Sequence, residues 1–336
     1  MKAQSNATSK KRALVTGATG AVGPALVAAL VAAGYEVVAL ARRCPQDARL
    51  PANIHFIQGD IADSNVIETA VCNIDIIFHL AAKLHLNNPS PDLDAEYQRI
   101  NVTATQQLVA AAKKAGVQRF IFFSTINVYG ESEPPQIFDE TVQPNPMGLY
   151  AQTKYEAEKA ALSFRSPMGT PLSVILRLSS VYGPYMQGNY LRLVKLMRKG
   201  WFIPIGRGQN RRTLIFDQDV AQAALLAAET PEALGQIYNI TDCTTPTFQE
   251  ILGAIYSVLE RPLPRVTLPD RPLRLGLLLL EKLSTLLGRP SSIGASTIDK
   301  LQEDMAVCGR KAQQQLNFKP QYNLQQGWRA TIASWK

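Results

Sequence analysis

Cysteine and histidine are scarce in this 336-residue chain, which contains four cysteines and three histidines. The cysteines form no C-x-x-C pair and no histidine cluster accompanies them, so we expect no metal site. A chain of this length can bury a sizeable core without disulfides. Cys44, Cys72, Cys243 and Cys308 are therefore predicted to be reduced, mostly buried thiols of a cytoplasmic protein.

A secretory signal is also missing, because residues 1–10 are polar and contain no apolar core. We interpret residues 1–11 as a flexible tail. Residues 13–35 contain no charged side chain and are long enough to span a bilayer. However, Gly17, Gly20, Gly23 and Pro24 divide this stretch into a short strand, a turn and a helix, which favours a nucleotide-binding start.

Acidic residues are outnumbered, with 27 Asp and Glu against 35 Lys and Arg, which gives a net charge of +8. This excess suits anionic ligands such as phosphates. The basic residues are scattered and form no stripe with aromatic platforms, as a nucleic-acid surface would require. The composition therefore favours a small anionic ligand and argues against nucleic acid.

Short apolar runs alternate with helical segments through the first half of the chain. This alternation predicts an α/β fold of the doubly wound type, with a parallel sheet covered by helices on both faces. The predicted strands are 13–16, 35–40, 54–57, 75–80, 119–124 and 173–178, and the predicted helices include 24–33, 94–115 and 150–164.

After Gly183 the strands become shorter, and prolines and glycines become denser. We predict a Rossmann domain over 12–180, followed by a smaller, partly interleaved substrate domain over 181–336. Strands around 212–216 and 236–240 are expected to return to the core. The segment 271–287 is apolar with basic residues, and it is either an amphipathic helix of the second domain or a peripheral membrane contact.

The glycine-rich segment Thr16–Gly23 follows a predicted strand and opens a helix. Its glycines, Gly17, Gly20 and Gly23, allow a tight turn and close backbone approach, and the helix N-terminus offers N–H groups to a diphosphate. The G-x-x-G-x-x-G spacing differs from the usual G-x-G-x-x-G, so only its position between strand and helix makes it specific.

The end of the second predicted strand bears on the choice between NAD and NADP. An acid there binds the ribose hydroxyls of NAD, whereas arginine accommodates the 2′-phosphate of NADP. Arg42 and Arg43 follow this strand and no acid does, so NADP is slightly favoured, with a solvated basic loop as the alternative. Asp60, followed by Ile61 after the third strand, can accept a hydrogen bond from adenine or cap a helix.

Tyr150 and Lys154 lie four residues apart on a predicted helix, so their side chains share one face. A neighbouring ammonium favours the phenolate form of tyrosine and can bring it into the range of acid–base chemistry. Ser124 and Thr125 end the fifth strand, at the edge where ligands bind in an open parallel sheet. A hydroxyl there can bond a substrate oxygen beside Tyr150.

Together these motifs resemble the extended short-chain dehydrogenases/reductases, of the nucleotide-sugar epimerase/dehydratase family, over about residues 12 to 335. The resemblance includes the glycine turn, the Tyr150–Lys154 pair and these further segments: Asp60, His79–Ala82, Asn101-Val102, Val128–Gly130, Arg177, Gly183-Pro184, Arg212, Asp219–Ala221 and Tyr238–Ile240.

The resemblance implies an NAD(P)-dependent enzyme similar to the UDP-glucose 4-epimerases, acting as an epimerase or as a dehydrogenase/reductase, and forming a homodimer. The implied catalytic residues are Thr125, Tyr150 and Lys154. The implied cofactor-binding residues are Gly17, Thr19, Gly20, Gly23, Arg42, Arg43, Asp60, Ile61, Ala81, Asn101, Tyr150 and Lys154. The implied substrate-binding residues are Ser124, Thr125, Ser180, Asn189 and Arg212.

Departures from the family pattern narrow the reaction. Ile126 and Asn127 replace the Asp-Glu pair of sugar 4,6-dehydratases, which disfavours dehydration, and Asn127 also replaces the Glu of the decarboxylases. Ser180 stands where many members carry Asn, which puts one phosphate contact in doubt. We therefore expect hydride transfer at C4 of a nucleotide-diphosphate hexose. The alternatives are oxidation of a steroid or lipid alcohol, as in 3β-hydroxysteroid dehydrogenases, and a non-catalytic NAD(P) sensor.

Overall fold

The computed structural model describes residues 10–47, 49–84, 93–132, 136–264, 266–269, 272 and 302–335. Two of the predictions from sequence concern residues that lie mostly outside these ranges. The tail over 1–11 is described only from residue 10, and the apolar segment 271–287 lies outside the described residues apart from Pro272.

Seven parallel strands form the central sheet, in the order β3-β2-β1-β4-β5-β6-β9. The predicted doubly wound α/β fold is confirmed. The elements up to the sixth strand are β1 (Arg12–Thr16), α1 (Gly23–Ala32), β2 (Glu36–Ala41), β3 (His55–Gln58), α2 (Ser64–Ala70), β4 (Ile76–His79), α3 (Leu93–Tyr97), the π-helix η1 (Gln98–Thr103), α4 (Ala104–Ala115), β5 (Arg119–Thr125), the 3-10 helix η2 (Ile126–Tyr129), α5 (Gly148–Leu162) and β6 (Ser173–Leu178).

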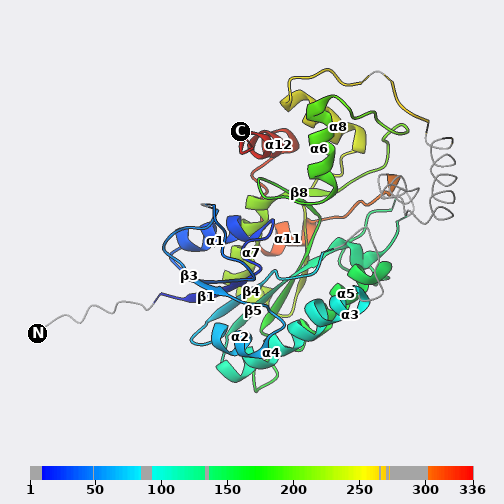
Figure 1. Ribbon diagram of the computed structural model, residues 1–336. Helices are drawn as coiled ribbons and strands as arrows, with labels where there is room; N and C mark the ends of the chain where they lie inside the picture. The colour runs from blue at the N-terminus through cyan, green and yellow to red at the C-terminus, as the bar shows by residue number, and fades with distance from the viewer. Residues whose placement is uncertain are drawn as a thin grey trace, which may run out of the picture.

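Alternate side chains of the strands pack under two helical layers, one on each face of the sheet. Val15 of β1 belongs to the core that includes α1, whereas its neighbour Leu14 packs with α2 and α4 on the other face. Figure 1 shows α1 and α7 on one side of the sheet and α2, α4 and α5 on the other. Because both faces are covered, the central residues of most strands are apolar on both sides of the sheet, which is why these strands appear in the sequence as short apolar runs.

The long helix predicted over 94–115 contains a π-helical section. The chain runs through α3, then η1, then α4. A wider π turn is common at functional sites. Here it contains Asn101, whose amide bonds the main chain of Lys83.

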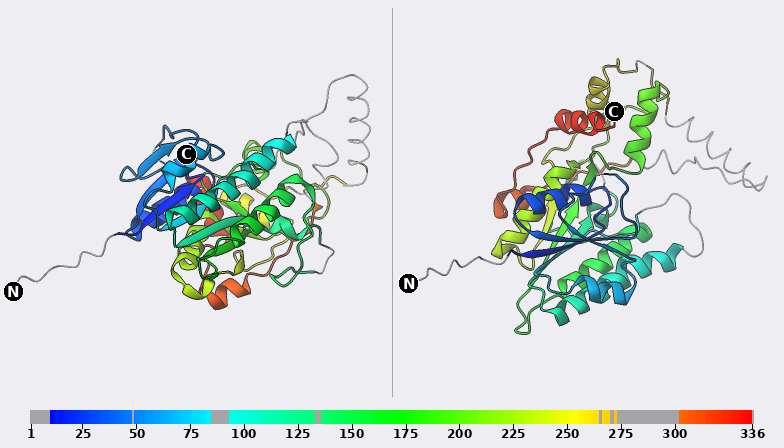
Figure 2. Two further views of the ribbon diagram at one scale, coloured as in Figure 1. Left: turned by 90° about the horizontal axis from the view of Figure 1, so that it is seen from below. Right: turned by 60° about the vertical axis from the view of Figure 1, so that its left-hand side comes forward.

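The remaining elements build a second lobe and also complete the first. They are β7 (Ser180–Tyr182), α6 (Asn189–Lys199), β8 (Leu214–Phe216), α7 (Asp217–Glu229), the 3-10 helix η3 (Pro231–Ala233), β9 (Ile237–Ile240), α8 (Phe248–Val258), α11 (Arg310–Gln315) and α12 (Leu324–Ala333). The helices α6, α8 and α12 stand together away from the large sheet in Figures 1 and 2. They share a separate apolar core around Trp328 and Tyr182.

The two strands expected to return to the core behave differently. The strand predicted over 236–240 forms as β9 and pairs with β6 at the edge of the large sheet. The strand predicted over 212–216 forms as β8, which pairs with β7 in a separate two-stranded sheet. Ile215 of β8 nevertheless packs in the same core as α1 and α7.

The cysteines depart from the prediction of mostly buried thiols, which is wrong. Cys44, Cys72 and Cys243 are exposed and Cys308 is half-buried, and all four are free. They lie in loops after strands or at helix ends rather than on core-facing positions. In the part of the chain that the structure describes, no helix is both long enough and apolar enough to cross a bilayer.

Candidate active site

A cavity of about 770 Å³ opens at the carboxyl ends of the central strands. Ligands bind at this edge in open parallel sheets. The cavity runs from the glycine turn after β1 to the beginning of α5. Its lining includes these predicted site residues: Gly17, Thr19, Gly20, Gly23, Arg42, Arg43, Asp60, Ile61, Ala81, Ser124, Thr125, Tyr150 and Lys154.

The glycine turn packs tightly against the strand beside it. Gly17 has a φ of +71°, and a Cβ there would lie 2.8 Å from the main-chain nitrogen of Ala81. A Cβ on Gly23 would collide with the carbonyl group of Ala18. Helix α1 begins at Gly23 with no side-chain cap and no acidic residue in its first turn. The residues at this helix start, Ala21, Val22 and Gly23, line the cavity, and an uncapped helix N-terminus suits a diphosphate.

A buried chain of hydrogen bonds holds this cradle in place through His79. The Thr105 hydroxyl donates to the carbonyl oxygen of Asn101 at 2.7 Å, so it must accept from Nε2 of His79 at 3.0 Å. Nδ1 of His79 then accepts from the Thr16 hydroxyl at 2.7 Å, and the Ala81 N–H donates to the same hydroxyl. Burial lowers the pKa of His79 to about 3, so the ring stays neutral at physiological pH.

Three of the predicted cofactor contacts, Arg42, Arg43 and Asp60, line the cavity at the ends of β2 and β3. Arg42 and Arg43 are exposed at the end of β2, beside the buried Ala41. Burial raises the pKa of Asp60, but hydrogen bonds from the Ala62 N–H and from Arg99 outweigh it and lower the pKa overall. Asp60 is therefore an ionised acceptor at the rim.

Tyr150, Thr125 and Lys154 meet at the other end of the cavity. The neighbouring Thr125 side chain lowers the pKa of Tyr150, but burial dominates and raises that pKa to about 12. Lys154 is 2% exposed and its Nζ lies 4.0 Å from the centroid of the Phe122 ring. Burial lowers the pKa of Lys154 to about 7. The sequence predicts that Lys154 lowers the pKa of Tyr150, but in the free protein this pKa is raised.

A buried ion pair between Glu158 and Arg177 lies one turn of α5 beyond Lys154. Glu158 accepts two hydrogen bonds from Arg177 of β6, at 3.0 and 2.8 Å. Both side chains are almost fully buried. The Arg177 guanidinium also lies over the ring of Tyr129, 4.9 Å from its centroid. This arrangement ties β6 to α5, the helix that carries Tyr150 and Lys154.

Asn101 does not line the cavity, although it is among the predicted cofactor contacts. Its side-chain oxygen accepts from the Lys83 N–H at 2.7 Å, and its amide group donates to the Lys83 carbonyl and to Thr153. The residue is 2% exposed. Asn101 therefore positions Lys83, which does line the cavity.

The predicted substrate contacts separate into two groups. Ser124 and Thr125 line the cavity, whereas Ser180, Asn189 and Arg212 do not. Arg212 instead donates to Glu303 at 3.0 Å. Ser179, which directly follows β6, lines the cavity in place of its neighbour Ser180.

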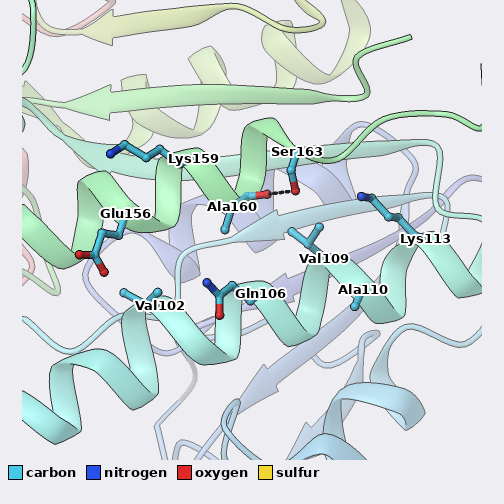
Figure 3. A pocket seen from close by; sticks show the side chains of 9 residues that line it. All are labelled: Val102, Gln106, Val109, Ala110, Lys113, Glu156, Lys159, Ala160 and Ser163. Carbon is cyan, nitrogen blue, oxygen red and sulfur yellow. Dashed lines mark hydrogen bonds between the residues drawn. The ribbon is translucent and has the colours of Figure 1, made fainter. Parts of the chain in front are cut away.

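A second groove, of about 530 Å³, lies between α4 and α5 and contains none of the predicted site residues. Figure 3 shows its polar side chains, which include Gln106 and Lys113 from α4 and Glu156 and Lys159 from α5. No acid–base pair or glycine turn borders it. The predicted catalytic residues Thr125, Tyr150 and Lys154 line the cavity at the strand ends instead.

The model of the NAD dependent epimerase/dehydratase family matches residues 13–241. The chain belongs to this family. It is thus a member of a family of NAD-dependent enzymes, and the recognition made from the motifs is confirmed.

Curated proteins that resemble the chain over two thirds or more of its length differ from one another in activity. UDP-glucose 4-epimerase of Vibrio cholerae is 28% identical over 330 residues, covering 96% of this chain and 94% of the relative. dTDP-D-glucose 4,6-dehydratase of Mus musculus is 36% identical over 248 residues, covering 68% of each. A 3 beta-hydroxysteroid dehydrogenase/Delta 5-->4-isomerase of Mycobacterium tuberculosis is 29% identical over 328 residues, covering 94% of this chain and 88% of the relative.

A solved structure with the same fold is MoeE5 in complex with UDP-glucose and NAD. It is 28% identical to this chain, with a TM-score of 0.73, and the match covers 96% of this chain and 98% of MoeE5. The spread of activities among these proteins means that membership of the epimerase/dehydratase family leaves the substrate open.

The residues of this epimerase/dehydratase family member fit a dinucleotide. The uncapped N-terminus of α1 and the closely packed glycine turn are suited to a diphosphate, and the cavity continues to Tyr150 and Lys154. Among the described residues there is no group of three or more His, Cys, Asp or Glu side chains that could hold a metal ion.

The prediction from sequence missed three lining residues with polar side chains, Lys83, Ser179 and Gln187. Lys83 directly follows the His79–Ala82 motif, so its position after β4 was a usable signal. Ser179 and Gln187 lie in irregular segments around β7, where no periodicity shows which side chain faces the cavity. The hydroxyls of Ser124 and Ser179 are both buried and have no hydrogen-bond partner among the described residues.

Proposed function

We propose that the enzyme transfers hydride between NAD(P) and the C4 position of a nucleotide-diphosphate hexose, as an epimerase or as a reductase. The observation that carries this proposal is the meeting of Tyr150, Thr125 and Lys154 at one end of a cavity whose other end is the glycine turn. The V. cholerae relative and MoeE5, whose names refer to UDP-glucose, support the substrate class.

In this proposal the bound dinucleotide supplies a hydride acceptor or donor. Tyr150 is protonated in the free protein, because its pKa is raised to about 12, and can donate its proton to a keto oxygen. In the opposite direction Tyr150 accepts the hydroxyl proton, and Thr125 orients the same oxygen. The Lys154 ammonium, which predominates below pH 7, favours loss of the Tyr150 proton.

We also propose that the enzyme prefers NADP to NAD. Ala41 stands at the end of β2, and Arg42 and Arg43 line the cavity without an ion-pair partner in the described parts of the chain. Their guanidinium groups are therefore free to bind a 2′-phosphate. The family name and the MoeE5 complex refer to NAD, so a direct comparison of the two cofactors is needed.

The proposed substrate is tested by supplying UDP-glucose, UDP-glucuronic acid and dTDP-glucose with each cofactor. Product formation is followed by mass spectrometry and by cofactor absorbance, with Tyr150→Phe as the inactive control. We expect turnover of at least one nucleotide sugar. Turnover of a steroid or lipid alcohol, with none of the nucleotide sugars, would move the assignment to the second candidate.

The second candidate is a hydroxysteroid or lipid-alcohol dehydrogenase. One observation favours it: Arg212, which the family resemblance assigns to the nucleotide phosphate, is paired with Glu303 and does not line the cavity. Calorimetry with UDP distinguishes the candidates. Binding that Arg212→Ala abolishes without lowering the melting temperature supports the nucleotide sugar. A non-catalytic NAD(P) sensor is disfavoured, because a sensor has no need of Tyr150 and Lys154.

The predicted organisation of the molecule is part of the proposal. We infer a Rossmann domain over 12–180, a substrate domain over 181–336, a homodimer and a cytoplasmic location. Sedimentation velocity tests the homodimer, since it would double the 36.9 kDa mass of one chain.

A further inference from the structure

A basic and apolar surface covers the end of the second lobe, at a distance from the catalytic chemistry. We define the basic–apolar face as residues 195–203 together with 261–264 and 266–268. Large apolar side chains are unusually exposed on it. Six of the ten exposed large apolar side chains among the described residues belong to it: Leu196, Trp201, Ile203, Leu263, Val266 and Leu268.

Hydrogen bonds join the two segments of the basic–apolar face into one surface. The Leu268 N–H donates to Pro204 at 2.8 Å, and the Gly206 N–H donates to Leu268 at 2.9 Å. At the end of α6, Gly200 lies close to Arg261, because a Cβ built on Gly200 would be 3.0 Å from Nη1 of Arg261. The exposed side chains therefore form a continuous patch at the end of α6, which stands away from the large sheet in Figures 1 and 2.

Basic side chains outnumber acidic ones in this region, although Arg211 and Arg212 are paired with Asp304 and Glu303. No Asp or Glu occurs from residue 159 to residue 216, and residues 189–212 contain seven Lys and Arg. On the basic–apolar face, Lys195, Arg198, Lys199 and Arg261 have no ion-pair partner among the described residues. The neighbouring Glu260 is the single carboxylate in the described parts of 257–269.

Trp201 is the most exposed large apolar side chain of the basic–apolar face. It is 72% exposed, and the ammonium group of Lys199 lies 5.1 Å from the centroid of the ring. An exposed indole beside lysine and arginine suits the interface of a bilayer, where the ring enters the headgroup layer and the cations meet lipid phosphates. Charge complementarity therefore selects an anionic lipid surface over a neutral one.

We propose that the basic–apolar face docks the enzyme on an anionic phospholipid membrane. The proposal is independent of the reaction at Tyr150, because none of these residues lines the active-site cavity. Gln187, which does line it, precedes α6, and Trp201 follows α6. A helix of this length spans about 16 Å, so docking leaves the cavity clear of the bilayer.

The test is flotation of the full chain with vesicles of phosphatidylcholine alone or with about one-third phosphatidylglycerol. Wild type is expected to float with the anionic vesicles and to dissociate as salt is raised. Each cation near an anionic surface strengthens binding by about five-fold. The triple variant Lys195→Gln/Arg198→Gln/Lys199→Gln should therefore bind about a hundred-fold more weakly, whereas Lys113→Gln/Lys114→Gln, on α4, should bind as wild type.

Fluorescence identifies the contact directly, because Trp201 is exposed whereas Trp328 is buried and Trp335 is partly buried. Anionic vesicles should shift the emission of wild type to shorter wavelength, and Trp201→Phe should lose this shift. Equal binding by wild type and the triple variant overturns the proposal. So does self-association that Trp201→Ala abolishes in the absence of vesicles, since the face would then join two copies of the chain.

Discussion

Lys154 and Glu158 lie one helical turn apart on the buried face of α5, and the Glu158 carboxylate raises the pKa of Lys154. Burial nevertheless dominates and lowers that pKa to about 7. Glu158 is itself paired with Arg177. The charge of Lys154 is therefore adjusted by a structural ion pair that does not line the cavity.

Replacement of Tyr150 by phenylalanine is expected to lower the rate on the identified substrate by about 10²–10⁴-fold, because it removes the acid–base group. Cofactor affinity should change little. Turnover measured by cofactor absorbance, together with cofactor titration, checks both expectations. A variant that kept a rate near that of wild type would show that another group transfers the proton.

Replacement of Lys154 by methionine is expected to stabilise the free protein at pH 7 while impairing turnover. The pKa of Lys154 falls from 10.5 to about 7 on folding. The unfolded chain thus binds more protons between these values, and the stability of wild type increases as pH rises through this window. The advantage of the variant should therefore shrink from pH 7 to pH 10. Thermal melts across this range measure it, and an advantage that grew with pH would contradict the assigned pKa.

Removal of one partner of the Glu158–Arg177 pair should be strongly destabilising. Glu158→Gln leaves the Arg177 guanidinium buried without its carboxylate, which costs about 3–5 kcal/mol. Urea denaturation measures this loss. The double variant Glu158→Gln/Arg177→Met should recover part of it. If the double variant lost more stability than Glu158→Gln and Arg177→Met lose when their separate losses are added, this would argue against a direct pairing.

Ser179→Ala should stabilise the free protein yet weaken binding of a ligand in the cavity. Its hydroxyl is buried without a partner among the described residues, and such a group is costly unless a ligand bonds it. The lost bond is worth about 0.5–1.5 kcal/mol, or about 2–10-fold in affinity. Ser173→Ala is the matched control, because Ser173 is also buried and unpartnered but lies outside the cavity lining. Equal ligand affinity of wild type and Ser179→Ala would exclude the contact.

The paired change Arg42→Ala/Arg43→Ala should weaken NADP binding by about 10–100-fold, since charge-assisted bonds to phosphate contribute about 1.5–3 kcal/mol. NAD binding should be nearly unchanged. Calorimetry with both cofactors provides the comparison, and Arg310→Ala, an exposed arginine on α11, controls for general charge. Tighter binding of NAD than NADP by wild type would refute the proposed preference.

Local patterns determined the fold and much of the cavity. Apolar strand runs bounded by turns and helices predict a parallel sheet, and the carboxyl edge of such a sheet gathers whatever follows each strand. The glycine turn, Arg42, Asp60 and Thr125 therefore line one cavity, as their positions at strand ends indicate. The spacing of Tyr150 and Lys154 likewise follows from the period of one helix.

Only the tertiary structure decided which side chains are left for a ligand. Arg212 is paired with Glu303, about ninety residues away, and Asn101 is bonded to Lys83 across the π turn. Ser179, and not its neighbour Ser180, lines the cavity where the chain leaves β6 for β7. The physical reason is that the path of the chain between helices and strands brings such partners together. That path depends on the packing of distant segments, and no local periodicity records it.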